Sequence, residues 1–263
     1  MSFSPSPHFS SRSPGVSGPE PLAPLLELPG VGEAVTSVRE SIDRLLSHRV
    51  LRRQSAAVTA ESALRGARAS AALDGVDVSL ATLRAGGPTD PVVQGALRAS
   101  LGVGELVETW QRAPLQALAR LHVLAAADRV PADELGRPSG DAEVSARLEG
   151  LATLVAGGSR APAAVLAAVV QGELLVLRPF GSANGVVARA AARLTLVGRA
   201  LDPKLVSVPE VGHLERRAEY AEALAAYAHG TAQGVAAWLR HCCTALGLGA
   251  QEGLAICEAL LRR

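Results

Sequence analysis

Residues 176–192, LVLRPFGSANGVVARAA, combine residue types that could bind an anion. Asn184 is the only asparagine of the chain, and Phe180 is one of three phenylalanines. Asn184 and Gly185 stand where a helix is expected to begin, and the first turn of a helix offers free N–H groups and a positive dipole end. Gly185 allows close approach to the backbone, and Arg189 lies one turn further on. The segment predicts either a phosphate-binding loop or an ordinary asparagine cap with a glycine turn.

The composition argues against several other kinds of protein. The 26 basic and 25 acidic residues give a net charge of +1 and are scattered, whereas a nucleic-acid-binding protein needs a clustered basic face. There is no basic-then-apolar signal segment, and the longest apolar stretch, residues 161–170, is too short to span a bilayer. We therefore expect a soluble, cytoplasmic protein that contacts neither nucleic acid nor membrane.

Three cysteines, Cys242, Cys243 and Cys257, lack the C-x-x-C spacing of a metal site. Adjacent cysteines on a helix point about 100° apart, so one metal ion could hardly bind both. We expect reduced, mostly buried thiols, and no metal site.

The apolar periodicity indicates helices throughout, and no segment has the alternation of a strand. We expect a disordered Ser/Pro-rich tail over residues 1–22 and one helical domain over 23–263. The predicted helices cover about 32–51, 56–75, 91–110, 114–127, 141–157, 162–177, 184–201, 211–229, 231–246 and 251–263. The helix over 162–177 is apolar on most faces, which is typical of the central helix of a bundle.

The loop resembles the motif H-P-F-x-[DE]-G-N-G-R-x-x-R of the Fic (Fido) family, aligned with RPFGSANGVVAR at residues 178–189. Two further segments are similar to the family: 217–246 to the region after the motif, and 118–127 to the helix before the family's flap. The resemblance implies a helical bundle around a central helix–loop–helix, with N-terminal helices over 32–113 and a core over about 114–250. Five of the nine defined motif positions are kept: Pro179, Phe180, Asn184, Gly185 and Arg189.

Fic enzymes typically transfer AMP from ATP to a target hydroxyl, and the resemblance implies which residues here would take part. Arg178 stands at the position of the general base, and arginine has no acceptor and stays protonated. Ser182 replaces the acidic Mg²⁺ ligand, Ala183 the first glycine, and Val186 the first arginine. The flap, between His122 and Asp141, has little strand character and is reduced. Residues 182–185 and Arg189 would be what remains of the nucleotide site, so that ATP and Mg²⁺ are conceivable ligands and no catalytic residue is assigned.

Residues 67–79 resemble the family's inhibitory motif, S/T-x-x-x-E-G, through Ser70, Asp74 and Gly75. The resemblance implies that Asp74 pairs with Arg189 and blocks the γ-phosphate. Because aspartate is one methylene shorter than glutamate, we expect a contact that is direct or passes through one water. The alternative is that Asp74 only caps the helix end at Gly75.

Three interpretations follow for the whole chain. The first, which we favour, is a degenerate Fic protein without transferase activity that regulates or binds an unidentified protein partner and retains some nucleotide or phosphate binding. The second is an active nucleotidyl or phosphoryl transferase with altered chemistry. The third is a helical interaction protein with no ligand.

Overall fold

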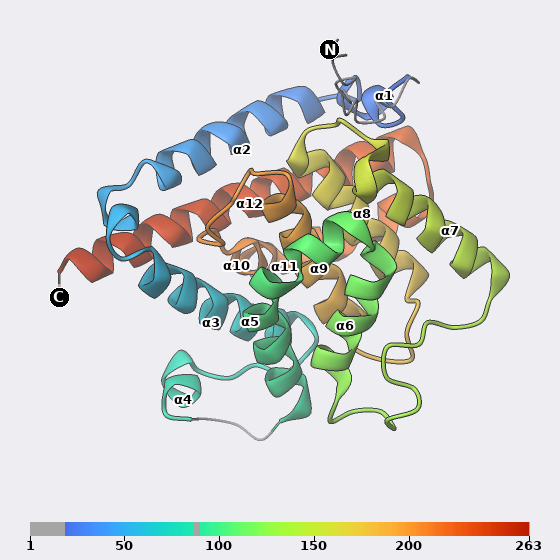
Figure 1. The fold of residues 1–263 in the computed structure, drawn as a ribbon. Coiled ribbons are helices and arrows are strands. Elements are labelled where there is room, and N and C mark those ends of the chain that lie inside the picture. Colours follow the sequence, from blue (N-terminus) through green and yellow to red (C-terminus); the bar gives the residue numbers. More distant parts are fainter. Residues whose placement is uncertain (1–18, 87–89, 263) are drawn as a thin grey trace, which may run out of the picture.

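The computed structural model describes residues 19–86 and 90–262. Within these residues the chain is all-α, as the apolar periodicity predicts, and contains no strand (Figure 1). None of the described helices is long and apolar enough to cross a membrane. The elements in chain order are α1 (Ala23–Leu26), α2 (Val31–Leu46), η1 (Arg49–Arg52), α3 (Ser55–Leu73), α4 (Leu80–Arg84), α5 (Pro91–Arg112), α6 (Pro114–Ala126), α7 (Ala142–Thr153), η2 (Leu154–Gly158), α8 (Ala163–Leu177), α9 (Asn184–Gly198), α10 (Pro209–Glu215), α11 (Arg217–Ala228) and α12 (Ala232–Leu261).

Helix α8 is the most apolar helix and lies in the middle of the molecule. It has almost no polar face, and most of its side chains are buried, because α9, α12, α11, α2 and α7 pack around it (Figure 1). A helix that is hydrophobic all round has to be enclosed in this way. Since α9 is packed along α8, the loop that joins them, residues 178–183, is held at both ends by the core.

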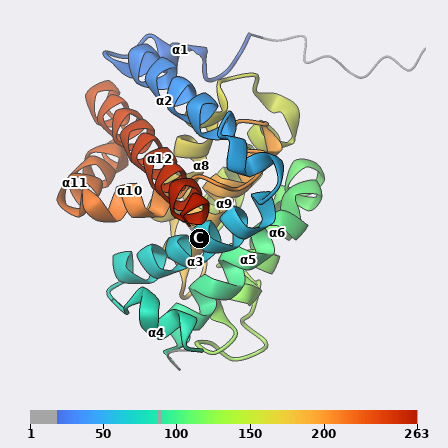
Figure 2. The same cartoon turned by 90° about the vertical axis from the view of Figure 1, so that its left-hand side faces the viewer.

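Helix α12 is one continuous helix, where the sequence predicted two separate helices over 231–246 and 251–263. The glycines between them resemble a stop, yet Gly249 is a contact point: the backbone N–H of Val208 donates to its carbonyl oxygen at 3.0 Å. At about 1.5 Å per residue, the 30 residues of α12 span roughly 45 Å. Figure 2 shows α2 lying along this helix, which also supports α10 and α11.

Residues 211–229 were predicted as one helix, but the structure has two helices there, α10 and α11. The chain leaves helical geometry at Arg216 (φ −111°, ψ 39°), between α10 and α11. The break allows α10 to pack on α3 and α12, while α11 packs on α12 and α8. Such a break depends on contacts that are distant in sequence, so the local pattern does not reveal it.

The end of the predicted tail is ordered against the fold. Residues 1–18 lie outside the described part of the chain, but residues 19–22 are placed, and Leu22 is buried. The carboxylate of Glu20 accepts hydrogen bonds from the Ser159 hydroxyl at 2.6 Å and from the Arg160 backbone N–H. The folded region therefore begins before residue 23, because Glu20 attaches the chain to the loop that precedes α8.

We predict that Gly249→Ala destabilises the protein, whereas Gly247→Ala, two residues earlier in the same helix, stabilises it. A Cβ at position 249 would lie 2.5 Å from the carbonyl carbon of Val208, and overpacking of this kind typically costs about 1–3 kcal/mol. A Cβ at position 247 meets nothing within 4 Å, so alanine should add about 0.5–1 kcal/mol through helix propensity. Urea unfolding of both variants measures this. Equal effects at the two positions would contradict the tight packing of α12 against the segment before α10.

Candidate functional site

The α8–α9 loop changes direction through two residues in left-handed backbone conformation. Arg178, the C-cap of α8, has φ 47°, and Ala183, immediately before α9, has φ 56°. Residues with a Cβ adopt this conformation at an energetic cost, and the Fic motif has a glycine at the position of Ala183. The surrounding contacts therefore have to hold the loop in shape.

The side chain of Asn184 closes the loop into a ring. Its Oδ1 accepts from the Phe180 backbone N–H at 3.0 Å, and its Nδ2 donates to the Phe180 carbonyl oxygen at 2.7 Å. The N-cap position of α9 belongs to Ala183, which has no side-chain cap. Asn184 therefore does not cap the helix, and its amide group is already bonded within the loop.

Phe180 anchors the loop in the core. Its side chain is 5% exposed and stacks on the imidazole of His122 in α6, with ring centroids 4.2 Å apart and planes 5° from parallel. The Pro179 carbonyl oxygen accepts a hydrogen bond from Ser139 N–H at 2.7 Å. The segment that replaces the flap is thus attached directly to the loop and contains no strand over 127–141.

His122 is a site residue that the sequence analysis did not recognise. Its Nδ1 accepts from the Gly136 backbone N–H at 2.9 Å, which places the proton of the neutral ring on Nε2. Burial lowers the pKa of His122, the charge of Arg129 lowers it further, and the nearby Ser182 backbone partly opposes this. With its acceptor nitrogen occupied, the neutral imidazole cannot take a proton from a hydroxyl group, so His122 does not offer a general base in this arrangement.

The two positions that align with the base and the metal ligand of the Fic motif, Arg178 and Ser182, offer little chemistry. The Arg178 side chain is exposed and has no hydrogen-bond or ion-pair partner in the described part of the chain. The hydroxyl of Ser182 is buried and also lacks a partner there. A neutral hydroxyl is a poor Mg²⁺ ligand without carboxylates beside it. No group of three His, Cys, Asp or Glu side chains within residues 19–86 and 90–262 could hold a metal ion. The loop therefore does not fit Mg²⁺.

Arg189 forms a buried cluster with the end of α3. Its guanidinium donates from Nε to the Ser70 hydroxyl at 2.9 Å, and from one NH₂ group to the Ser70 carbonyl oxygen at 2.9 Å and to Asp74 Oδ1 at 2.7 Å. The Arg189 side chain is 3% exposed and that of Asp74 is 21% exposed. Burial acts to lower the pKa of Arg189, but the Asp74 carboxylate and Tyr220 outweigh it and raise the pKa above its ordinary value. Arg189 is therefore permanently charged and directly paired.

The carboxylate of Asp74 also covers the beginning of α9. A Cβ at Gly185 would collide with Asp74 Oδ1 and come within 3.0 Å of its other carboxylate oxygen. Only glycine permits this approach. The carboxylate thus lies against Gly185 in the first turn of α9, while its hydrogen bond is to Arg189.

Gly75 holds Asp74 at this position by ending α3. Gly75 has φ 96°, its N–H donates to the Ala72 carbonyl at 3.0 Å, and Val76 N–H donates to the Ala71 carbonyl at 3.0 Å. This is the Schellman arrangement of a glycine-terminated helix. The structure therefore brings Ser70, Asp74, Gly185 and Arg189 together, while Arg178 lies apart from them in solvent.

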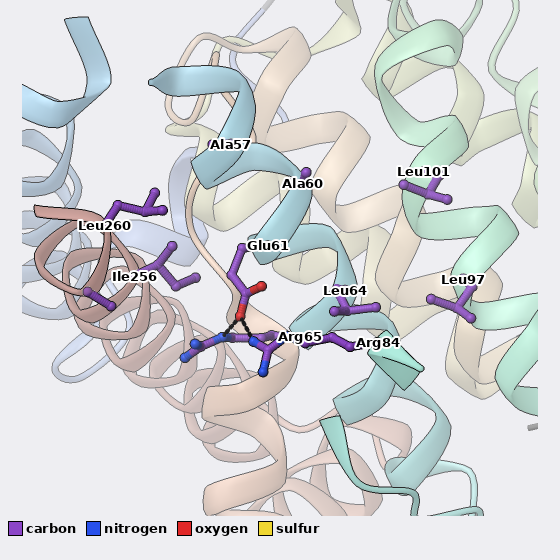
Figure 3. A pocket seen from close by; sticks show the side chains of 11 residues that line it. Ala57, Ala60, Glu61, Leu64, Arg65, Arg84, Leu97, Leu101, Ile256 and Leu260 are labelled. Atoms are coloured by element: carbon purple, nitrogen blue, oxygen red, sulfur yellow. Dashed lines mark hydrogen bonds and ion pairs between the residues drawn. The ribbon is translucent and has the colours of Figure 1, made fainter. Parts of the chain in front are cut away.

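A separate groove lies between α3, α5 and the end of α12, with a cavity of about 340 Å³ (Figure 3). Leucines from α5 form one wall, and Ile256 and Leu260 form the other. Its carboxylate, Glu61, is bonded to both Arg65 and Arg84, and Arg65 also bonds Glu252 at 2.5 Å. Because these charges neutralise one another, the groove has no free group for catalysis, and the α8–α9 loop remains the candidate site.

No protein-family model and no curated protein matches the chain, whereas its structure resembles solved structures of Fic proteins. A Fic family protein from Desulfovibrio desulfuricans aligns with TM-score 0.70 and 20% identity over 86% of this chain and 74% of that one. A fragment of Fic-1 from C. elegans aligns with TM-score 0.69 and 19% identity over 90% and 75%. A Fic domain containing signaling protein from Bacteroides thetaiotaomicron aligns with TM-score 0.63 and 13% identity over 86% of this chain and 98% of that one. At sequence identities of 13–20%, this structural similarity shows that the chain has the Fic fold, and it shows the fold alone.

We predict that Phe180→Ala lowers the free energy of unfolding by about 3–5 kcal/mol, because a buried aromatic side chain is removed and His122 loses its stacking partner. Val123→Ala is the control. Val123 follows His122 in α6 but is 41% exposed, so its truncation should cost less than about 1 kcal/mol. Denaturant unfolding distinguishes the two. A small loss for Phe180→Ala would mean that the loop is not anchored through this ring.

Proposed function

We propose that this chain is a degenerate Fic protein that does not transfer AMP, acts as a regulatory or partner-binding protein, and retains a phosphate-binding site closed by Asp74. The observation that carries the proposal is the position of the Asp74 carboxylate, against Gly185 and bonded to Arg189. A carboxylate in this place imitates a phosphoryl oxygen. It implies that the site still prefers an anion.

The loss of transfer follows from the groups at the reacting positions. A general base contributes about 10²–10⁴ to a rate, and the guanidinium of Arg178 cannot serve as one. The site does not supply the carboxylate that would hold Mg²⁺, because Ser182 replaces it. The parts that support the loop, Phe180 and Asn184, do not themselves perform chemistry.

Residual anion binding would require only groups that are present at the loop: the N-terminal end of α9 and the Arg189 guanidinium. The helix dipole and the first-turn N–H groups of α9 do not depend on the lost side chains. Arg189 would supply the positive charge once Asp74 moves away, since its guanidinium points to the same place. A polyphosphate such as that of ATP is the ligand class that fits this combination.

The two alternatives make different demands on the same residues. An active transferase would need another group to take the proton of the target hydroxyl, and His122 has its acceptor nitrogen occupied. A helical interaction protein without a ligand would need the Asp74 carboxylate only to neutralise the buried Arg189. The additional contact of Asp74 with Gly185, which this pairing does not require, is what supports a closed anion site. A protein partner and a cytoplasmic location remain part of the proposal.

We predict no AMP transfer to the protein itself or to lysate proteins during incubation with labelled ATP and Mg²⁺. The reason is the simultaneous loss of base and metal ligand at Arg178 and Ser182. Intact-mass analysis and gel autoradiography are the measurements. An AMP adduct formed by the unaltered chain, and abolished by Asn184→Ala, would instead support the active transferase.

We predict that Asp74→Ala tightens ATP binding by about tenfold or more, equivalent to about 1.4 kcal/mol, because the competing carboxylate is gone. The same change should cost about 2 kcal/mol of stability, less than for a fully enclosed pair because Asp74 is partly exposed. Asp77→Ala is the control, since Asp77 pairs with Arg68 at 2.9 Å and is 70% exposed.

Calorimetric titration with ATP, with and without Mg²⁺, and thermal unfolding provide both readouts. If Asp74→Ala binds ATP no better than Asp77→Ala does, the closed anion site is wrong and the chain is better described as an interaction protein.

A further inference from the structure

A second buried ion pair lies one helical turn beyond Arg189. Arg193 follows Arg189 by four residues in α9, and both guanidinium groups face α3. Arg193 is 2% exposed, and Glu210, in the first turn of α10, is 4% exposed. Arg193 Nη1 lies 3.7 Å from Glu210 Oε1, which is longer than a hydrogen bond. The two charges are therefore paired without being in direct contact.

The other carboxylate oxygen of Glu210, Oε2, is buried and has no hydrogen-bond partner in the part of the chain that the structure describes. Arg193 does not satisfy it. The guanidinium of Arg193 instead makes long hydrogen bonds, to Ser100 Oγ at 3.4 Å and to the carbonyl oxygens of Leu205 and Ser207 at 3.3 and 3.4 Å. Because a buried acceptor without a donor is costly, Oε2 requires a further donor.

Glycine at position 66 leaves a small cavity beside this oxygen. A Cβ at Gly66 would lie 3.1 Å from Glu210 Oε2 and 3.2 Å from Arg193 Nη1. The cavity has about 10 Å³, and its polar walls come from Ser70, Ser100, Arg193 and Glu210. Of these four residues, all except Ser100 are buried. A volume of this size is just sufficient for one water molecule.

Ser70 supplies a second polar contact to the cavity. It follows Gly66 by one turn of α3, so the two Cβ positions are about 5–6 Å apart on the same face of the helix. Ser70 Oγ accepts a hydrogen bond from Arg189 Nε at 2.9 Å. Within residues 19–86 and 90–262, the hydroxyl proton of Ser70 has no acceptor. The cavity thus lies between a hydroxyl that can donate and a carboxylate oxygen that must accept.

Other occupants fit this cavity less well than water does. A metal cation would meet the positive charge of Arg193, and an anion would meet the carboxylate of Glu210. Cavities that stay empty are lined by apolar groups, whereas this one contains the unpartnered Glu210 Oε2. A water molecule can both donate and accept, so it satisfies the groups on both sides.

We propose that one internal water molecule is bound here, accepting hydrogen bonds from the Ser70 hydroxyl and Arg193 Nη1 and donating one to Glu210 Oε2. About three hydrogen bonds are usual for a buried water. Since a hydroxyl has a single proton, donating it to the water turns the lone pairs of Ser70 Oγ toward Arg189. The water therefore links the two buried ion pairs of α9. This site does not depend on anion binding at the α8–α9 loop.

The test combines a high-resolution crystal structure of the full chain with magnetic relaxation dispersion of water in solution. The unaltered protein should show one ordered water within hydrogen-bond distance of Ser70 Oγ and Glu210 Oε2. Gly66→Ala fills the cavity, so it should remove this water and lower the dispersion amplitude by that of one long-lived water. It should also shift the nuclear magnetic resonance signal of Arg189 Nε–H. Gly150→Ala adds the same methyl group in α7, where nothing lies within 4 Å, and should change none of these readouts.

The structure of the unaltered protein decides the proposal even if Gly66→Ala does not fold. A cavity without water, with Glu210 Oε2 bonded directly to Arg193, would overturn it. Retention of the water in folded Gly66→Ala, or an equal loss in Gly150→Ala, would show that the water does not occupy this place. An Arg189 signal that stays unchanged when the water is lost would remove the orientation of Ser70. ATP titration of Asp74→Ala bears only on the proposed function, so the two failures can be told apart.

Discussion

Arg189 carries a positive charge into the core, and that charge has to be neutralised where it lies. An unpaired buried guanidinium would be strongly destabilising, so α9 can take its place along α8 only if Asp74 and Ser70 of α3 lie opposite it. The cluster therefore sets the register of α3 against α9. Because α3 also packs on α5 and α10, the same constraint extends from the loop to the N-terminal half of the molecule.

The residues that shape the loop are distinct from those that would make it a catalyst. Phe180, Pro179 and Asn184 bond or pack within the protein, and their roles are complete without a substrate. Arg178 and Ser182 align with the base and the metal ligand of the Fic motif, and within residues 19–86 and 90–262 neither side chain makes a hydrogen bond or an ion pair. The side chains that hold the conformation of this loop are therefore different from those aligned with its chemistry in the motif.

The sequence predicted the features whose signals are local. The continuous apolar run of α8 and the glycine stop after Asp74 both follow from neighbouring residues. The features it did not predict depend on distant partners. Gly249 looks like a helix stop until Val208 is seen beside it, and His122 gives no hint of Phe180, 58 positions later in the chain. The hydrogen bonds that join Gln171, His213, His241 and Glu219 are the extreme case, because these residues come from four helices and have no shared spacing.

The covered first turn of α9 also has a consequence for discrimination between anions. Asp74 is tethered to the protein and is always present at high effective concentration, so a free anion competes with it on unequal terms. The apparent affinity of any ligand is reduced by the fraction of molecules in which the carboxylate has left. In the function proposed above, small, abundant ions that form one or two contacts would fall below this threshold. The pair formed by Asp74 and Arg189 would then act as a filter against common anions, through competition from within the chain.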